Sequence, residues 1–383
     1  MTYSLDDIQV YIPTYNRPEL LRESIKSLVS QSIGVPKITV INNGTLQETT
    51  DVINEFKDYG IIEYKSSGEL FASMDKVAEL VQSPYVMIFH DDDILNSEYL
   101  KYAIKALNTY DNIAFITTRT KDFTNQDDVD LSPASDEFYL FDSKKDFSQF
   151  MYLNELIAMQ TAIYNVELFK KHSRDFDLYG KFCDWPYLVK LSGFGKVILF
   201  NDKKMFNVRI HPAQYTNDSA SGLSLEQLIN WHKQFYDSME VSDENLLSNY
   251  IFYSKFHILF EGAYNNLISA KAKSEISLED AIEKAGNIIG FDSKDLIYNK
   301  SILIVPIQKY LECKNYYKNF QRLAKDNSEK SPDFVKFVLV KTIEYINDVY
   351  INKKDTHKTI NILGIKFKVK KSFLSKIKHL LER

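Results

Sequence analysis

A short apolar segment that ends in three consecutive aspartates is the feature that most constrains the fold of this 383-residue chain. Residues 85–89 are typical of a buried strand, and Asp91, Asp92 and Asp93 follow after one histidine. Carboxylates this close repel one another unless a cation lies among them. Mg²⁺ and Mn²⁺ prefer oxygen ligands of this kind. The alternative is that Asp92 or Asp93 caps a following helix.

The N-terminal part of the chain alternates strand-like and helix-like segments. A strand over Ile8–Ile12 leads into the polar loop 13–17, and Pro18 suits the first turn of an amphipathic helix, with Asn16 or Arg17 near its cap. The alternation continues with a strand over 37–41, a helix over 45–57, a strand over 61–64 and a helix over 70–81. Because ligands of open α/β sheets bind beyond the carboxyl ends of the strands, we expect residues 14–17 and 90–93 to face one cleft.

Several motifs follow one another along this pattern: Val10–Arg17, Ile41–Thr45, Phe89–Asp93, Phe182–Trp185 and Arg209–Gln214. In this order they resemble the inverting nucleotide-sugar glycosyltransferases of family 2. The resemblance covers roughly residues 5–220. It implies an α/β fold of the GT-A (Rossmann-like) type, with a mixed, mostly parallel sheet flanked by helices. Helical patterns after this region predict a mainly helical C-terminal region.

The resemblance also implies roles for individual residues. Asp184 would be the catalytic base, and Mn²⁺ or Mg²⁺ would be held by Asp91, Asp93 and His211, with Asp91 and Asp93 forming a D-x-D motif. The nucleotide-sugar would be bound by Pro13, Thr14, Tyr15, Asn16, Arg17, Asn43, Asp75, Asp91, Asp92, Arg209 and His211.

The chain departs from the family pattern at two motifs. Asn42 and Asn43 stand where relatives usually have two aspartates, and an amide can still donate and accept hydrogen bonds to a base. Cys183 stands where a glutamate usually precedes the catalytic aspartate, which leaves Asp184 as the strong base candidate. Asp184 could instead cap a helix that contains Pro186, and Trp185 could be an apolar wall, an acceptor platform or a core residue.

His211 and Arg209 follow a strand-like segment. Histidine can ligate a metal or donate to a phosphate, and arginine matches phosphate oxygens with paired donors. The alternative for His211 is an ordinary surface or core histidine.

The length of the chain predicts more than one domain. We expect a GT-A domain over 1–222, a helical accessory domain over 223–350 and a basic amphipathic tail over 351–383. The helical patterns cover 225–239, 244–270, 278–289, 309–324 and 332–352. Their aromatic residues, such as Phe252, Phe256 and Phe260, are expected to be core rather than sugar platforms. This domain could also form a homo-oligomer interface.

The tail concentrates positive charge. It holds ten lysine or arginine residues against Asp355 and Glu382, although the whole chain has a net charge of −5. Apolar residues alternate with the lysines, so we expect the tail to lie on an anionic membrane surface, being too short and charged to span one. The alternatives are a tail packed on the body or a nucleic-acid contact.

Two further features predict where the enzyme lies in the cell. No leader-like segment precedes the first strand, and Cys183 and Cys313 form no disulfide framework. We therefore expect a cytoplasmic enzyme, peripheral at the inner face of the membrane.

The preferred function is that of a metal-dependent inverting glycosyltransferase of bacterial surface or capsule polysaccharide biosynthesis. It would move a hexose or N-acetylhexosamine from a nucleotide-sugar, with UDP as the first choice, to a hydroxyl of a glycan or lipid-linked glycan. A sugar nucleotidyltransferase is the second candidate, although residues 13–17 supply no glycine for a phosphate loop. The third is a non-catalytic glycan-binding or scaffold protein.

Overall fold

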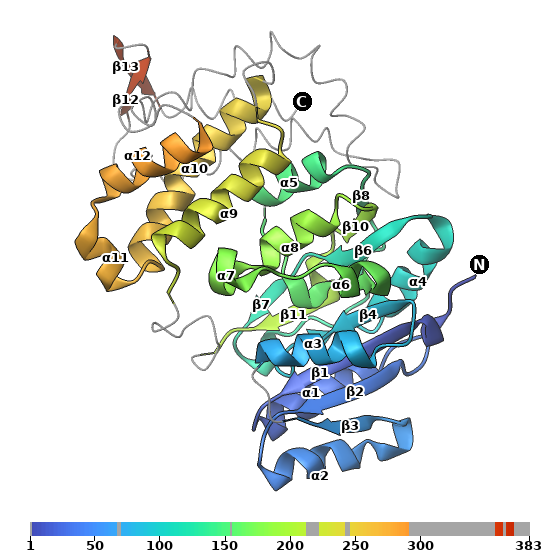
Figure 1. Cartoon of the computed structure of the whole chain (residues 1–383). Helices are drawn as coiled ribbons and strands as arrows, with labels where there is room; N and C mark the ends of the chain where they lie inside the picture. The colour runs from blue at the N-terminus through green and yellow to red at the C-terminus, as the bar shows by residue number, and fades with distance from the viewer. Residues whose placement is uncertain are drawn as a thin grey trace.

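The computed structural model of the protein describes residues 2–66, 70–153, 155–211, 222–241, 246–290, 357–362 and 365–370. An eight-stranded sheet lies at its centre (Figure 1). Its strands are β1 (Ile8–Thr14), β2 (Lys37–Asn42), β3 (Ile62–Lys65), β4 (Tyr85–Ile88), β6 (Ile113–Thr118), β8 (Phe138–Phe141), β9 (Ile163–Asn165) and β10 (Lys196–Phe200).

The sheet is mixed and mostly parallel, as the sequence predicts. Its order is β3-β2-β1-β4-β9-β6-β10-β8. Strands β3, β2, β1 and β4 are parallel to one another, β6 is parallel to β10, and β9 and β8 run against their neighbours. The carboxyl ends of β1, β2, β4, β6 and β10 therefore lie at one edge of the sheet.

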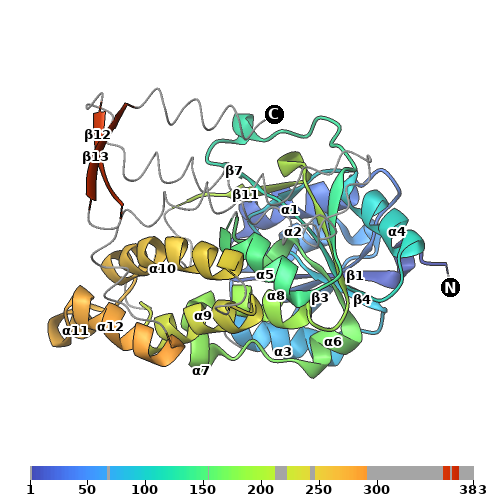
Figure 2. The same ribbon diagram turned by 90° about the horizontal axis from the view of Figure 1, so that it is seen from above.

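Helices cover both faces of the sheet because its central strands are apolar on both sides. In β1, Val10 and Ile12 belong to one buried cluster and Tyr11 to the other. The first cluster is covered by α1 (Pro18–Val29), α2 (Gln47–Glu55) and α4 (Tyr99–Thr109); the second by α3 (Leu70–Leu80), α5 (Lys144–Leu153), α6 (Val166–Lys171) and α8 (Asp184–Leu191). In Figure 2, α1 and α2 lie on one side of the sheet and α3 and α6 on the other.

A second, small sheet lies beside the carboxyl edge. Its order is β5-β11-β7, and its strands are β5 (Ile94–Leu95), β11 (Phe206–Arg209) and β7 (Lys121–Phe123). The residues that follow Asp93 directly thus form β5 rather than a helix. The expectation that Asp92 or Asp93 caps a helix is therefore wrong.

A helical region follows, as the sequence predicts, with α9 (Leu225–Ser238), α10 (Leu246–Asn266), α11 (Ala270–Glu275) and α12 (Leu278–Ile289). Ser224 and Gln227 form a capping box at the start of α9. Phe252, Phe256 and Phe260 are fully buried, which confirms their assignment to a core. The helices expected over 309–324 and 332–352 lie outside the described residues.

The helical region shares its apolar core with one face of the large sheet. Tyr152 of α5 stacks on Phe252 of α10 at 5.1 Å, and Trp185 of α8 meets Trp231 of α9 edge to face at 6.0 Å. His232 of α9 is also buried here, and its Nδ1 lies 3.0 Å from the hydroxyl of Tyr152. Burial among aromatic rings lowers the pKa of His232 to about 3.

Two strands of the tail are described, β12 (His357–Ile362) and β13 (Ile365–Lys370), and they form an antiparallel pair. The rest of the tail lies outside the described residues. Across the described part of the chain, none of the helices has the length and apolar character that crossing a membrane requires.

Candidate active site

The loops after β1 and β4 meet because these strands are parallel neighbours in the sheet. The register pairs Tyr11 with Ile88, and the Phe89 amide donates to the Tyr11 carbonyl just beyond the last paired residue. The Thr14 hydroxyl then donates to Oδ2 of Asp91 at 2.7 Å. This contact brings together one residue from each of the two segments, 14–17 and 90–93, that were expected to face one cleft.

Arg17 brings a positive charge to two of the three aspartates. Its Nη1 lies 3.4 Å from Oδ1 of Asp91 and 3.3 Å from Oδ2 of Asp92. His211 Nε2 lies 3.0 Å from the same Oδ2 of Asp92. These four residues, each expected to bind the donor, therefore form one contact network with Thr14.

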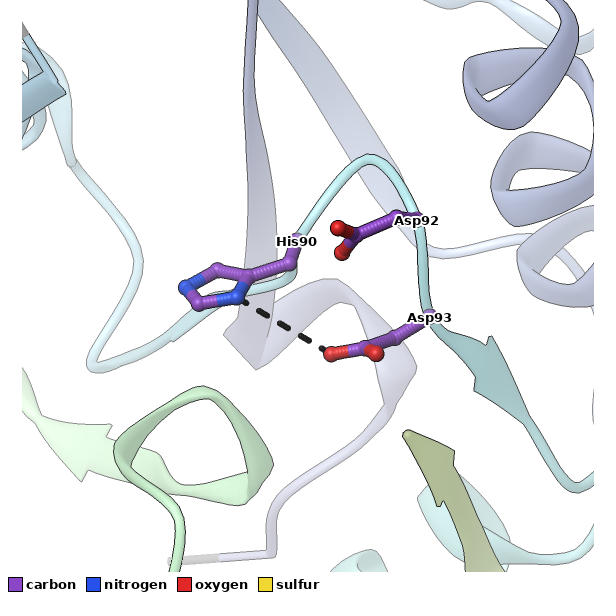
Figure 3. Close-up of side chains that lie close together, drawn as sticks. All are labelled: His90, Asp92 and Asp93. Carbon is purple, nitrogen blue, oxygen red and sulfur yellow. Dashed lines mark ion pairs between the residues drawn. The ribbon is translucent and has the colours of Figure 1, made fainter. Parts of the chain in front are cut away.

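Asp93 is the most enclosed of the three carboxylates. Its Oδ1 accepts a hydrogen bond from the Arg209 amide at 3.1 Å, and its Oδ2 accepts one from the Gln160 side chain at 3.3 Å. His90 Nδ1 lies 3.9 Å from Oδ2 of Asp93. In Figure 3 the His90 ring and the Asp93 carboxylate point toward one another, and Asp92 projects from the same loop.

A candidate metal site lies in this loop. One ligand atom each of His90, Asp92 and Asp93 lies within 4.8 Å of the others. Two carboxylates and an imidazole suit a divalent cation such as Mn²⁺, so the side chains fit such an ion. The set expected from the sequence was Asp91, Asp93 and His211; the structure adds His90 and Asp92 beside Asp93, and joins His211 to the group through Asp92.

Burial and the charge of Asp92 make Asp91 and Asp93 costly to ionise. The pKa of Asp91 is raised to about 6, first by burial and then by the charge of Asp92, with the Thr14 hydrogen bond and Arg17 opposing the rise. Burial and Asp92 likewise raise the pKa of Asp93 well above its usual value, against the hydrogen bond from the Arg209 amide. A bound cation would favour the ionised forms.

The Arg209 side chain connects the aspartate loop to α1 and to the small sheet. Its Nε donates to the Asp92 carbonyl at 3.0 Å, and its Nη2 pairs with Glu23. The guanidinium also lies over the Phe123 ring, 4.5 Å from its centroid. Strand β11 aligns Arg209 with Phe123 of β7, so the small sheet sets this arrangement.

The loops after β1 and β2 are held together by Asn16. Its Oδ1 accepts hydrogen bonds from the amides of Thr45 at 2.9 Å and Leu46 at 3.0 Å, and its backbone is left-handed, with φ of 53°. Gly44 lies so close that an added Cβ would collide with the Asn16 side chain and amide. The amide of Asn43 donates to the Thr14 carbonyl at 3.0 Å, which places Asn43 beside the same loop.

Asp184 lies in the first turn of α8. The N-cap of this helix is Cys183, and no side chain makes the capping hydrogen bond, so the capping alternative for Asp184 is wrong. Burial raises the pKa of Asp184, while the charges of Arg174 and His90 and the hydrogen bond from Cys183 lower it. The thiol donates to Oδ1 of Asp184 at 3.8 Å. Burial and the Asp184 charge raise the pKa of the Cys183 thiol to about 12, so it remains protonated and able to donate.

The remaining expected residues are dispersed around this centre. Pro13 is buried in β1, and Tyr15 is 64% exposed at the loop tip. Asp75 is exposed on α3, and none of the contacts described above involves it.

The sequence expectations placed His90 at the cleft but not in the metal group, and they did not include Gln160 at all. His90 had a signal, because it directly precedes the three aspartates on the same loop. Gln160 had none, because it lies in the short 3₁₀ helix Met159–Thr161, far from Asp93 along the chain.

The chain resembles known glycosyltransferases in sequence. Residues 9–172 match the model of glycosyl transferase family 2. An uncharacterised glycosyltransferase of Rickettsia prowazekii is 25% identical over 225 residues, which are 56% of this chain and 68% of that protein. Glycosyltransferase GlyA of Streptococcus pneumoniae is 28% identical over 109 residues, 27% of this chain and 16% of that protein.

Solved structures agree on the fold. Residues 1–349 of TarS from S. aureus, crystallised in complex with UDP-GlcNAc, superpose with a TM-score of 0.53 at 13% identity, over 94% of this chain and 96% of that one. The sheet and its flanking helices thus have a fold of the GT-A type. Residues 9–172 therefore carry the match to glycosyltransferase family 2, and the chain is a transferase enzyme.

Replacement of Asp91 by Asn should stabilise the metal-free protein near neutral pH. A carboxyl whose pKa rises from 3.8 to about 6 on folding destabilises the fold above pH 6, and this penalty fades as pH falls toward 3.8. The expected gain in unfolding free energy is roughly 1 to 3 kcal/mol at neutral pH and less in acid. Urea unfolding of both proteins at about pH 7.5 and about pH 4.5 measures it. The exposed Asp58→Asn is the control, and an equal or lower stability of Asp91→Asn at neutral pH would contradict the prediction.

Proposed function

We propose that this protein is a metal-dependent, inverting glycosyltransferase that moves a hexose or N-acetylhexosamine from a UDP-sugar to a hydroxyl of a glycan or lipid-linked glycan. The observation that carries the proposal is the network that joins the β1 loop to the three aspartates after β4. The likeness to TarS, whose crystals contain UDP-GlcNAc, supports a uridine nucleotide as the donor.

In this proposal the two strand-end loops hold the donor. Thr14, Arg17 and the Asn16–Asn43 region receive the nucleotide, and Asp92, Asp93 and His90 or His211 hold Mn²⁺ or Mg²⁺. The metal, when bound, stabilises negative charge on a leaving diphosphate. Arg209 acts as a positioning residue, because its guanidinium is already committed to the Asp92 carbonyl, Glu23 and Phe123.

Asp184 would accept the proton of the attacking acceptor hydroxyl. A single displacement from the face opposite the leaving group inverts the anomeric centre and needs no covalent intermediate. The pKa of Asp184 is raised by burial, which makes it a stronger base than an exposed aspartate. The Cys183 thiol, which donates to Oδ1, limits this rise and fixes the carboxylate in place.

We further propose that residues 1–222 form the catalytic domain, that residues 223–350 form an accessory domain with a role in self-association, and that the product belongs to a bacterial surface or capsule glycan. The family resemblance supports the glycan class, and the capped helices from α9 onward support the second unit.

A donor screen by thermal unfolding should identify UDP. A ligand that binds only the folded protein raises Tm according to its concentration and affinity. With Mn²⁺ present, UDP or a UDP-sugar should raise Tm by several degrees, and GDP, dTDP and CMP should have little effect. EDTA should remove most of the UDP shift, and Asp93→Asn should weaken it. A response to GDP without one to UDP would show that the base is misassigned.

Asp184→Asn should abolish transfer without loss of donor binding. Removal of a general base costs roughly 10²- to 10⁴-fold in kcat. The measurement is release of UDP from UDP-sugar donors with glycan acceptors, together with UDP affinity by calorimetry. Asp177→Asn, an exposed neighbour on α7 (Phe176–Tyr179), is the matched control. Unchanged turnover in Asp184→Asn would remove the assignment of the base, and absence of turnover in the wild type with every donor would favour a scaffold.

We propose that residues 351–383 bind the anionic inner face of the cell membrane. In β13 the sequence alternates Ile365, Phe367 and Val369 with Lys366, Lys368 and Lys370, a period of two that matches a strand. Basic residues near an anionic lipid surface each contribute about 1 kcal/mol of attraction. This location would keep the enzyme close to a lipid-linked acceptor.

Truncation after Tyr350 should reduce co-sedimentation with phosphatidylglycerol vesicles and leave turnover of a water-soluble acceptor unchanged. Glutamine at Lys366, Lys368 and Lys370 should reproduce the loss. Phosphatidylcholine vesicles, which lack net charge, are the control. Equal binding of the truncated and full chains to anionic vesicles would argue against the anchor.

A further inference from the structure

Arg17 contacts the same carboxylate groups that a metal ion at the aspartates would bind, so the two cations would compete for them. Its Nη1 spans Asp91 and Asp92 at 3.4 and 3.3 Å. The oxygen of Asp92 that it contacts also lies 3.0 Å from His211, and Asp92 belongs to the group that can hold a cation. A divalent ion on Asp92 would lie close to the guanidinium, and two positive charges at that separation repel each other.

We propose that Arg17 is an exchangeable counter-cation, which competes with the metal for Asp91 and Asp92 and transfers to the diphosphate of the donor, so that metal and nucleotide bind cooperatively. This inference rests on the proposed function, because it requires a donor with a diphosphate. It adds to that function a dependence of metal affinity on the nucleotide. The metal alone binds weakly because Arg17 competes with it, and it binds more tightly once the nucleotide has drawn Arg17 away.

The surroundings of Arg17 suit an exchange of partners. Its backbone is fixed, since it is the N-cap residue of α1 and its carbonyl accepts from the Leu21 amide at 3.0 Å. The neighbouring Asn16 is also held, by Thr45 and Leu46. The Arg17 side chain is nevertheless 32% exposed, whereas those of Asp91 and Asp92 are 7% and 11% exposed. A long side chain can therefore turn about a fixed anchor while the carboxylates remain in place.

The other arginine at the aspartates, Arg209, is more enclosed than Arg17. Arg209 is buried, and its guanidinium is held by the Asp92 carbonyl, Glu23 and the Phe123 ring. Its charge stays near the loop in every ligand state that keeps the small sheet intact. Of the two arginines, Arg17 is thus the more exposed and the one whose side chain can reach the donor.

A diphosphate offers Arg17 a partner at least as good as the carboxylates. Guanidinium groups bind phosphate oxygens through paired, charge-assisted hydrogen bonds. Once Arg17 turns to the phosphates, Asp91 and Asp92 regain their negative potential and attract the metal more strongly. Coupling of this kind is reciprocal, so the metal must raise nucleotide affinity by the same factor.

Calorimetric titration of the whole chain with MnCl₂ alone, UDP alone, and each in the presence of the other tests this inference. In the wild type, UDP should tighten Mn²⁺ binding. In Arg17→Gln, Mn²⁺ alone should bind more tightly, by roughly 5- to 150-fold, and UDP should tighten it much less. The metal-free variant should also have a lower Tm, because Asp91 and Asp92 lose their counter-charge.

Two further variants separate this role from a general charge effect. Arg22→Gln makes the same charge change on α1, where Arg22 pairs with Glu19 and Glu55. It should leave Mn²⁺ affinity within about twofold, because these pairs do not involve the aspartates and salt screens the remaining charge. Arg17→Lys keeps the charge and should keep weak binding of Mn²⁺ alone.

The outcomes distinguish this inference from the proposed function. If the wild type binds Mn²⁺ and UDP but Arg17→Gln binds Mn²⁺ alone no more tightly than the wild type, the counter-cation role is wrong and the proposed function stands. Equal tightening in Arg22→Gln would overturn the role as well. If the wild type binds neither Mn²⁺ nor UDP, both are overturned.

Discussion

Three carboxylates lie at the end of a buried strand, and their negative charge must be compensated by other parts of the structure. Strand β4 delivers them to the sheet edge, where burial and mutual repulsion raise the pKa of Asp91 and Asp93. Their cost is lowered by donors from separate parts of the chain: the Thr14 hydroxyl, the Arg17 guanidinium and the Arg209 amide. The loops that bring these donors together also form the candidate site at the ends of β1 and β4. Electrostatic compensation and the architecture of the site are therefore the same feature.

The small β5-β11-β7 sheet explains how a distant segment reaches the aspartates. β5 follows Asp93 directly, and its pairing with β11 carries Arg209 to the aspartate loop. Pairing of β11 with β7 then places the Phe123 ring under the guanidinium. An arginine that sequence reasoning assigns to the donor thus has its side chain occupied by protein contacts. Arg209 therefore acts on the aspartate loop through its contacts with the protein.

The sequence was sufficient for features that depend on local pattern. Apolar strands that end in polar loops predicted the parallel part of the sheet, and the start and end of α12 agree with the expected 278–289. The capping alternatives for Asp92, Asp93 and Asp184 are wrong, because β5 follows the first two and Asp184 lies inside the first turn of α8. Gln160 could not be predicted as a partner of Asp93, because their contact arises from the placement of the 3₁₀ helix after α5 and not from spacing along the chain. The catalytic role of Asp184 and the metal set remain predictions.

The continuous apolar cluster between the sheet and α9–α12 has a consequence for how this enzyme could have diversified. Tyr152 and Trp185 lie on helices of the sheet layer, yet their rings rest on Phe252 and Trp231 of the later helices. Helix α8 carries both Trp185 and Asp184, so any repacking of the contacts between the sheet layer and the later helices would move the carboxylate as well. Exchange of the helical region for another module would therefore need compensating changes in these contacts, and descendants of such a chain should inherit the two parts together.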